Sequence, residues 1–227
     1  INSYIKKNQK KIVFTDGEDE NTLKAAIAFK NSKLGIPILV GKEEKIKEQI
    51  KKIGYNENFD IEIINSKDKP KREKYVKHLF KKMQREQGLL EWDCYRLIRN
   101  DRVIWASCMV ACGDADGAVT GNTRRFGASL DKIKQVVKPR SGEIMFGLNL
   151  IVHKGKSIFV GDTSVHEYPS AKQLSEIAIS AARVVKLFGF DPKVAFVSHS
   201  TFGQPLTSRT RHIKEAVKIL KDKRISS

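Results

Sequence analysis

The chain has 227 residues and a formal net charge of +17, from 43 Lys and Arg against 26 Asp and Glu. With 40% hydrophobic and 30% charged residues, its composition is that of a globular protein and excludes a disordered or fibrous one. No apolar run reaches the roughly 18 residues that a membrane span needs. The charge leaves three kinds of anionic partner open: nucleic acid, a membrane surface or an anionic small molecule.

The N-terminal residues and the cysteines indicate the kind of chain and the cellular compartment to expect. The first four residues contain no apolar signal core and begin without Met, so we expect a segment of a longer chain. Three cysteines cannot form an even disulfide framework, which favours a reducing, cytoplasmic location. Cys108 and Cys112 are one helical turn apart, but no further ligand follows at zinc-like spacing. We therefore expect buried cysteines and no metal site.

The first part of the chain alternates short apolar strands with helices. The predicted strands are 12–15, 36–40, 61–64 and 118–120, and the predicted helices are 23–29, 46–53, 67–82, 91–99, 101–111 and 129–137. Short strands that alternate with helices of ten or more residues indicate a parallel sheet covered by helices.

The pattern changes at the polar segment 138–143, where we place the boundary between domains 1–138 and 139–227. Two longer strands, 144–152 and 157–160, are predicted to pair as a hairpin. Ser170 and Gln173 fit a capping box at the start of a helix that ends near Gly189. A strand at 194–197 and a final helix at 213–220 complete the predicted elements.

The loop that follows the strand at 118–120 is the best candidate for an anion site. Loops beyond the carboxyl ends of parallel strands line the ligand crevice of such sheets. Glycines free the backbone, Thr and Asn supply donors, and arginines bind phosphate or carboxylate. The predicted contacts are Thr120, Gly121, Asn122, Thr123, Arg124 and Arg125. A solvated loop with incidental charge is the alternative.

The turn after the first strand, Asp16-Gly17-Glu18-Asp19-Glu20, lacks the G-x-G-x-x-G sequence of a dinucleotide-binding loop. Its carboxylates would repel a phosphate, and we expect them to stabilise the N-terminus of the following helix. No P-loop and no nucleic-acid-binding motif is present in the sequence.

Two further polar loops, 161–164 and 198–204, end strands in the second domain, and small polar residues are typical of loops that line clefts. His199 could act as a base towards a neighbouring serine. Sequence adjacency does not make a triad, however, and there is no G-x-S-x-G elbow, so we predict no catalytic residue.

The chain contains four motifs in a fixed order, at 14–26, 113–121, 161–163 with 168–178, and 193–203. In sequence and in order, these motifs resemble those of the phosphate acetyl/butyryltransferase family. Within this family the chain is most similar to the C-terminal phosphotransacetylase-like domain of bacterial multidomain NADP-dependent malic enzymes. That similarity lies in 87–90, in Ser198-His199-Ser200 and in Phe202-Gly203.

The resemblance implies an α/β fold of two α/β/α domains with a mostly parallel sheet and an interdomain cleft, as in isocitrate and isopropylmalate dehydrogenases, here truncated at the C-terminus. It implies acetyl-CoA or CoA as an allosteric ligand, a homo-oligomer, and neither a nucleic-acid nor a membrane partner. N-terminal malic enzyme domains of the parent would use NADP and a divalent metal, outside this chain, to decarboxylate malate. The cleft wall opposite the 120–125 loop would contain Asp162, Thr163, Ser198, Ser200 and Thr201.

The chain departs from active members of the family at two positions. Asp131 stands where they carry an arginine that binds the substrate, and Asn21 replaces an arginine common in the opening motif. The chain also ends before the family segment that supplies a serine, an arginine and a general-base aspartate. We therefore expect it not to transfer acetyl groups. The alternative is an active phosphate acetyltransferase, which converts acetyl-CoA and phosphate to acetyl phosphate and CoA.

Overall fold

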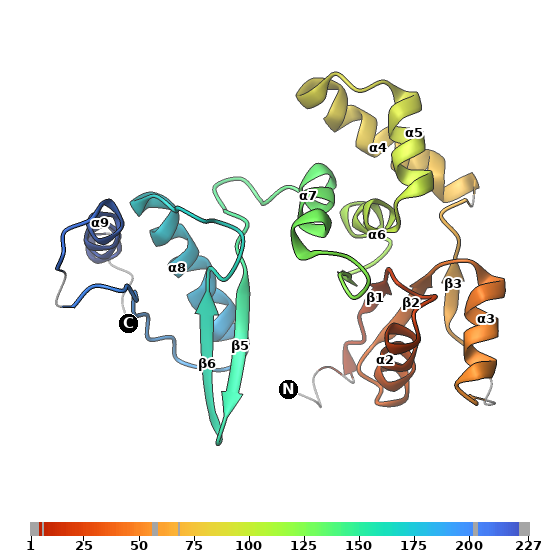
Figure 1. Ribbon diagram of the computed structural model, residues 1–227, viewed down its shortest axis with the longest axis horizontal. Coiled ribbons are helices and arrows are strands. Elements are labelled where there is room, and N and C mark those ends of the chain that lie inside the picture. Colours follow the sequence, from red (N-terminus) through yellow and green to blue (C-terminus); the bar gives the residue numbers. More distant parts are fainter. Residues whose placement is uncertain (1–4, 6, 56–58, 68, 202–203, 223–227) are drawn as a thin grey trace. The chain divides into compact units, whose positions relative to one another are not determined.

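The computed structural model describes residues 5, 7–55, 59–67, 69–201 and 204–222 (Figure 1). The chain divides into two compact units, Ile1–Lys138 and Pro139–Ser227. Within the described residues, no helix is both long and apolar enough to cross a membrane.

The first unit is built on a four-stranded parallel sheet with the order β3-β2-β1-β4. Its strands are β1 (Lys11–Phe14), β2 (Ile36–Val40), β3 (Glu62–Ile64) and β4 (Gly117–Val119). Val13 of β1 lies opposite Ile38 of β2 on one side and Ala118 of β4 on the other. The predicted parallel sheet is thus confirmed. Because the chain runs outwards from β1 to β3 and then returns to the other side of β1, the topological switch point lies between β1 and β4.

Helices cover both faces of this sheet (Figure 1). One face packs against α2 (Glu20–Asn31) and α3 (Glu43–Lys52), and the other against α4 (Lys69–Gln87), α5 (Glu91–Asn100), α6 (Arg102–Ala111) and α7 (Phe126–Val136). Successive side chains of a strand point to opposite faces, so Phe14 enters the core under α2 while Val13 enters the core under α4 to α6.

Several helices of the first unit differ in their bounds from the prediction, and α2 and α3 each begin three residues earlier than expected. α4 runs five residues further than expected and ends at Gln87. Gly88 follows it, and its φ of +65° is the left-handed conformation typical of the residue after a helix. α7 begins at Phe126, three residues earlier than expected, because Arg125 is the last extended residue before it.

The second unit contains a β-hairpin and two helices. β5 (Leu148–His153) and β6 (Lys156–Gly161) are antiparallel, and Lys154 and Gly155 between them both have positive φ, as a tight hairpin turn requires. α8 (Ala171–Leu187) and α9 (Ser208–Asp222) pack against each other. Ser170 Oγ accepts a hydrogen bond from the N–H of Gln173, and Gln173 Oε1 accepts one from the N–H of Ser170. The predicted hairpin and capping box are confirmed, but the first strand of the hairpin begins at Leu148, four residues later than predicted.

The predicted strand at 194–197 is wrong. The segment is not part of a ladder, and Val194 and Val197 are 53% and 89% exposed. A strand exists only where a neighbouring strand shares its backbone hydrogen bonds, and no described residue pairs with this segment.

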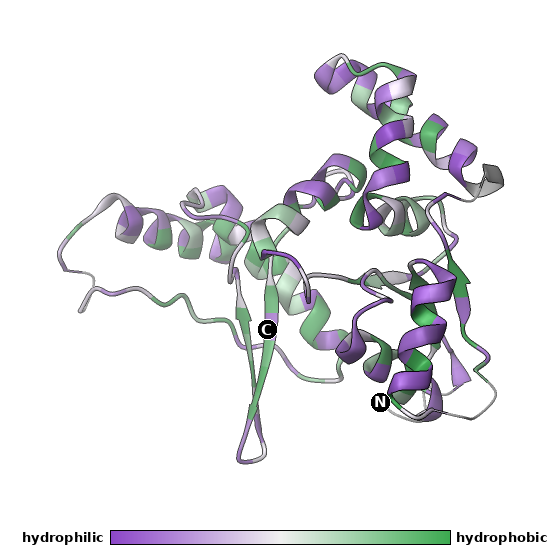
Figure 2. Ribbon diagram, turned by 45° about the vertical axis from the view of Figure 1, so that its right-hand side comes forward, coloured by the Kyte–Doolittle hydropathy of each residue, from purple (hydrophilic) through white to green (hydrophobic). Residues whose placement is uncertain are grey.

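The β5–β6 hairpin carries apolar side chains at exposed positions. Figure 2 shows the green colour of hydrophobic residues along its strands. The exposed apolar residues there are Leu150, Ile151, Val152, Ile158 and Val160.

Candidate functional site at the carboxyl edge of the parallel sheet

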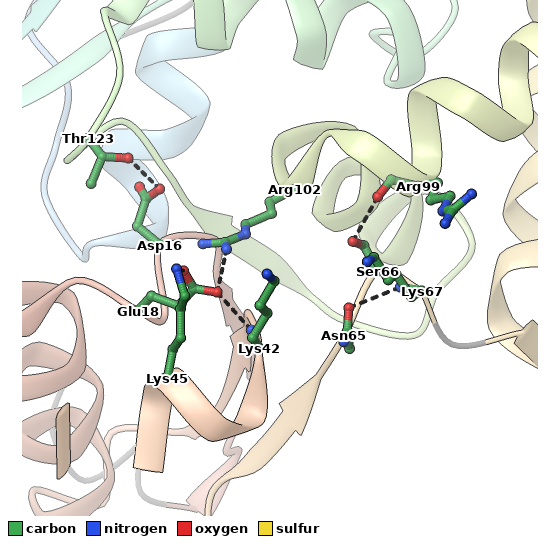
Figure 3. A network of polar contacts seen from close by, with 10 residues as sticks. All are labelled: Asp16, Glu18, Lys42, Lys45, Asn65, Ser66, Lys67, Arg99, Arg102 and Thr123. Carbon is green, nitrogen blue, oxygen red and sulfur yellow. Dashed lines mark hydrogen bonds and ion pairs between the residues drawn. The ribbon is translucent and has the colours of Figure 1, made fainter. Parts of the chain in front are cut away.

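The loops that follow β1 (15–19) and β4 (120–125) lie side by side at the switch point, and we call them the switch-point loops. Thr123 Oγ1 donates to Asp16 Oδ1 at 2.7 Å (Figure 3). Asn122 Nδ2 donates to Asp19 Oδ1 at 2.5 Å. The carboxylates of the first loop therefore hold the second loop in place, a role that the sequence pattern did not reveal.

The turn after β1 is fixed by a cap and by a close backbone approach. Asp19 is the N-cap of α2 and accepts from the N–H of Thr22 at 2.9 Å, which confirms the predicted helix-starting role. The N–H of Gly17 donates to the Val40 carbonyl at 3.2 Å. A Cβ at Gly17 would meet that oxygen at 3.0 Å and Leu39 Cβ at 3.1 Å, so any larger residue would push the turn away from β2 by a few tenths of an ångström.

The two arginines of the second loop have different surroundings. Arg124 Nη1 donates to Asp101 Oδ2 at 3.0 Å, while Asp101 Oδ1 accepts from the N–H groups of Val103 and Ile104 at the start of α6. Arg125 is exposed at the N-cap of α7, and it makes no ion pair with any residue in the described ranges. Of the two guanidinium groups, that of Arg125 is the one available to an external anion.

A small cavity of about 230 Å³ lies between the second loop and α7. Its lining residues are Thr120, Gly121, Phe126, Ser129, Leu130 and Ile133. Thr120 Oγ1 and Ser129 Oγ are buried and have no hydrogen-bond partner among the described residues. Buried hydroxyls are normally hydrogen-bonded, so these two mark a place where a ligand could bond.

Glu18 connects three elements at the same edge of the sheet (Figure 3). Its Oε1 accepts from the N–H of Lys42 at 2.8 Å and from Arg102 Nη2 at 2.5 Å, and Lys45 Nζ lies 3.9 Å from Oε2. Burial raises the pKa of Glu18, but the bonds from Arg102 and Lys42 outweigh it, so the pKa lies below its usual value. Glu18 thus ties the β1 turn to the N-termini of α3 and α6.

The end of β3 is tied to α5 in a similar way. Ser66 Oγ donates to the Arg99 carbonyl at 3.0 Å, and Asn65 Oδ1 accepts from the N–H of Lys67 at 3.1 Å (Figure 3). Side-chain bonds therefore fix the carboxyl edge of the sheet from β3 to β4.

In the second unit, Asp162 is the centre of a local network. Its carboxylate accepts from the backbone N–H groups of Gly147, Ser164, Val165 and His166, and His166 Nδ1 lies 2.6 Å from Oδ2. The Asp162 side chain is 3% exposed. Burial raises its pKa, but these donors more than compensate and hold the pKa below the usual value. Both of its oxygens are engaged within this unit.

Of the other predicted residues of the second unit, Thr163 lies next to Asp162, and Ser198, Ser200 and Thr201 have other partners. Thr163 Oγ1 donates to Asn149 Oδ1 at 3.2 Å beside Asp162, whereas the Ser198 and Ser200 hydroxyls are 2.6 Å apart. Thr201 exchanges backbone hydrogen bonds with Gln204. A cavity of about 360 Å³ is lined by Phe196, Val197, Ser198, Ser200, Thr210, Ile213 and Lys214. Within the described part of the chain, these serines share no hydrogen-bond partner with Asp162, and Phe202 and Gly203 lie outside it.

The cysteines are not arranged as metal ligands or as a nucleophile. Cys108 is fully buried, and burial raises the pKa of its thiol. Among the residues that the structure describes, no three His, Cys, Asp or Glu side chains are placed to hold a metal ion.

The sequence model of the family "Phosphate acetyl/butaryl transferase" matches residues 1–227. The chain belongs to this family. It is 36% identical over 222 residues to an NADP-dependent malic enzyme of Rhizobium meliloti (strain 1021), covering 97% of this chain and 29% of that enzyme. It is 29% identical over 219 residues to a phosphate acetyltransferase of Nitratidesulfovibrio vulgaris, covering 96% of this chain and 31% of that protein.

A solved structure, the EutD phosphotransacetylase from Staphylococcus aureus, superimposes with a TM-score of 0.84 and 27% identity, covering 98% of this chain and 66% of that one. The predicted family resemblance and the α/β fold with a mostly parallel sheet are therefore confirmed. The chain spans about three tenths of the length of these curated relatives. A phosphotransacetylase-like segment of this kind is thus part of longer malic enzyme chains.

Proposed function

We propose that this chain is the acyl-CoA-sensing domain of a cytoplasmic malic enzyme: it binds acetyl-CoA as an allosteric regulator, supports assembly of a homo-oligomer and does not itself transfer acetyl groups. The observation that carries the proposal is the pair of switch-point loops, locked together by Asp16 and Asp19 with the Arg125 guanidinium left exposed. The similarity of almost the whole chain to part of a malic enzyme supports the identity of the parent.

The residues of the first unit fit the chemistry of a CoA ester. The exposed Arg125 supplies a charged donor for a phosphate group. The unpartnered hydroxyls of Thr120 and Ser129 suit the amides of a pantetheine arm, and Leu130 and Ile133 provide apolar contacts beside them. In the second unit, Ser198 and Ser200 are the proposed contacts because their hydroxyls line a cavity beside Lys214.

Two side chains support the absence of acetyl transfer. Asp131 is exposed on α7 and Asn21 is exposed on α2, where active members of the family are expected to carry arginines. A carboxylate repels the phosphate that an arginine would bind, and a neutral amide does not attract it.

The parent malic enzyme provides the test. Malate turnover in the full-length protein, which we propose requires NADP and a divalent metal held by its other domains, should change when acetyl-CoA is added. The same protein with Arg125→Ala should need a higher acetyl-CoA concentration for the same change. Turnover that does not respond to acetyl-CoA would contradict the regulatory role.

An active phosphate acetyltransferase is the second candidate, and the similarity to the enzyme of N. vulgaris favours it. The two proposals differ in one assay of this chain, the formation of acetyl-CoA from acetyl phosphate and CoA. We expect no product above the rate without protein, and measurable turnover would establish the second candidate instead.

A further inference from the structure

A second open cavity of the first unit, of about 510 Å³, lies among α4, α5 and α7. Met83, Leu89 and Leu97 form its apolar part, and Met83 is 1% exposed. The polar residues that line it are Gln87, Asp93, Arg96, Asn100, Asp101, Lys132 and Gln135. It shares no lining residue with the cavity beside Thr120.

The charges in this cavity are only partly balanced. Asp101 is paired with Arg124, and Asp93 Oδ2 accepts from the N–H of Leu90 at the start of α5. Arg96 and Lys132, in contrast, make no ion pair with any described residue. Two unpaired cations beside apolar side chains favour a ligand that carries both an anionic group and an apolar body.

A buried acceptor in the same cavity also lacks a partner. Gln135 Oε1 is inaccessible to solvent and accepts no hydrogen bond from any described residue. A buried amide oxygen without a donor is uncommon in folded proteins. The side-chain amide of Gln135 at this wall of the cavity is therefore not satisfied by the described part of the chain.

We propose that the α4–α5–α7 cavity is a second ligand site, for a small organic anion whose carboxylate or phosphate pairs with Arg96 and Lys132. The apolar body of the ligand packs against Met83, Leu89 and Leu97. Its lining residues are not part of the switch-point loops, so binding to this cavity can be tested without acyl-CoA.

The cavity is connected to the switch-point loops through Asp101. This residue lines the cavity, caps α6 with Oδ1 and holds Arg124 with Oδ2. An anion at Lys132 and Arg96 competes with Asp101 for nearby positive charge and so changes the environment of Arg124. Binding of an anion in the cavity therefore alters the electrostatic environment of the 120–125 loop, which is proposed to bind acyl-CoA.

The site is tested with the ¹⁵N-labelled full chain, titrated with phenyl phosphate, benzoate and neutral benzyl alcohol. We expect saturable shifts of amides in 83–101 and 132–135, and benzyl alcohol should bind at least about ten-fold more weakly than the tighter anion. Whichever anion binds more tightly identifies the ligand as a phosphate or a carboxylate. Arg96→Ala and Lys132→Ala should each weaken that anion about ten-fold, whereas Lys134→Ala, an exposed lysine of the same helix outside the cavity, should not.

The connection to the loop has its own measurement. The side-chain Nε–H resonance of Arg124 should shift on titration of the wild-type chain and should be unaffected in Asp101→Asn, which keeps a good N-cap but loses the charge that holds the arginine. Equal binding of benzyl alcohol, or Arg96→Ala and Lys132→Ala affinities equal to that of Lys134→Ala, would overturn the site. An Arg124 resonance that does not move at saturation would overturn the connection. Titration of the same samples with acetyl-CoA tests the proposed acyl-CoA site on its own, so failure of one site can be told apart from failure of the other.

Discussion

At the scale of single residues, carboxylates organise the proposed binding edge. Asp16 and Asp19 hold the second switch-point loop, Asp101 holds Arg124, and Glu18 holds Arg102. An acidic turn thereby supports the proposed anion site indirectly, because its carboxylates position the loop that presents Arg125.

Glu18→Gln should destabilise the first unit. The change removes the charge that Arg102 and the N–H of Lys42 contact, and hydrogen bonds to a charged group contribute about 1.5–3 kcal/mol. We expect a loss of about 1–2 kcal/mol in the free energy of unfolding, measured by urea denaturation followed by Trp fluorescence. Glu43→Gln, which removes an exposed helical ion pair with Lys47, is the control and should cost under about 0.5 kcal/mol. Equal effects of the two changes would contradict the role given to Glu18.

The lowered pKa of Asp162 predicts that the second unit loses stability in acid. Because its pKa is lower in the folded state than in the unfolded chain, its contribution to stability is complete above the unfolded value of about 3.9 and is lost as the pH falls through the folded value. The protection of the β5 and β6 amides against exchange, taken relative to the intrinsic exchange rate at each pH, should therefore fall below about pH 4. In Asp162→Asn this acid-dependent part should be missing, and an unchanged pH profile in the variant would refute the assignment.

At the scale of secondary structure elements, α8 illustrates what local sequence determines. Its capping box was predicted from Ser170 and Gln173 alone, because the donors and acceptors involved lie three residues apart. The strand predicted at 194–197 failed for the opposite reason: its apolar pattern is local, but pairing requires a neighbouring strand that sequence periodicity cannot supply.

Ser170→Ala should destabilise α8 by about 1 kcal/mol, the usual cost of losing an N-cap side chain. The change in free energy is measured from amide exchange of the helix. Lys172→Ala, at an exposed position of the first turn, should leave exchange almost unchanged. A Ser170→Ala chain as protected as the wild type would show that the cap does not limit the stability of this helix.

The site was predictable only in part. The position of the 120–125 loop follows from parallel-sheet topology, since such loops follow the carboxyl ends of strands. The partners of its side chains do not, because Arg124 and Asp101 are 23 positions apart and Thr123 and Asp16 are 107 apart. Contacts over such separations depend on strand order, which the periodicity of the sequence left undetermined.

At the scale of the whole chain, the residues divide into two compact units, and the segment where they meet is exposed from Lys138 to Gly142. The Lys138–Pro139 bond resists trypsin, so we expect the first cut of limited digestion after Arg140. Mass spectrometry should then find a stable fragment 1–140, because the parallel sheet is covered on both faces. A first cut within 11–137 would contradict this division.

The net charge of +17 belongs mostly to solvated lysines, several of them in exposed pairs such as Lys24–Glu20 and Lys52–Glu48. Binding to generic DNA would fall steeply with salt if this charge were used for nucleic acid. We propose that the charge that contributes to ligand binding is that of a single side chain, Arg125.

Calorimetric titration of acetyl-CoA into this chain tests that claim most directly. The wild-type chain and Arg85→Ala, which removes an exposed arginine at the end of α4, should bind with equal affinity, and Arg125→Ala should bind about ten-fold more weakly. Arg124→Ala should have a smaller effect, because its guanidinium is already paired with Asp101. Affinity unchanged in both Arg124→Ala and Arg125→Ala, or no binding by the wild-type chain, would contradict the proposed site.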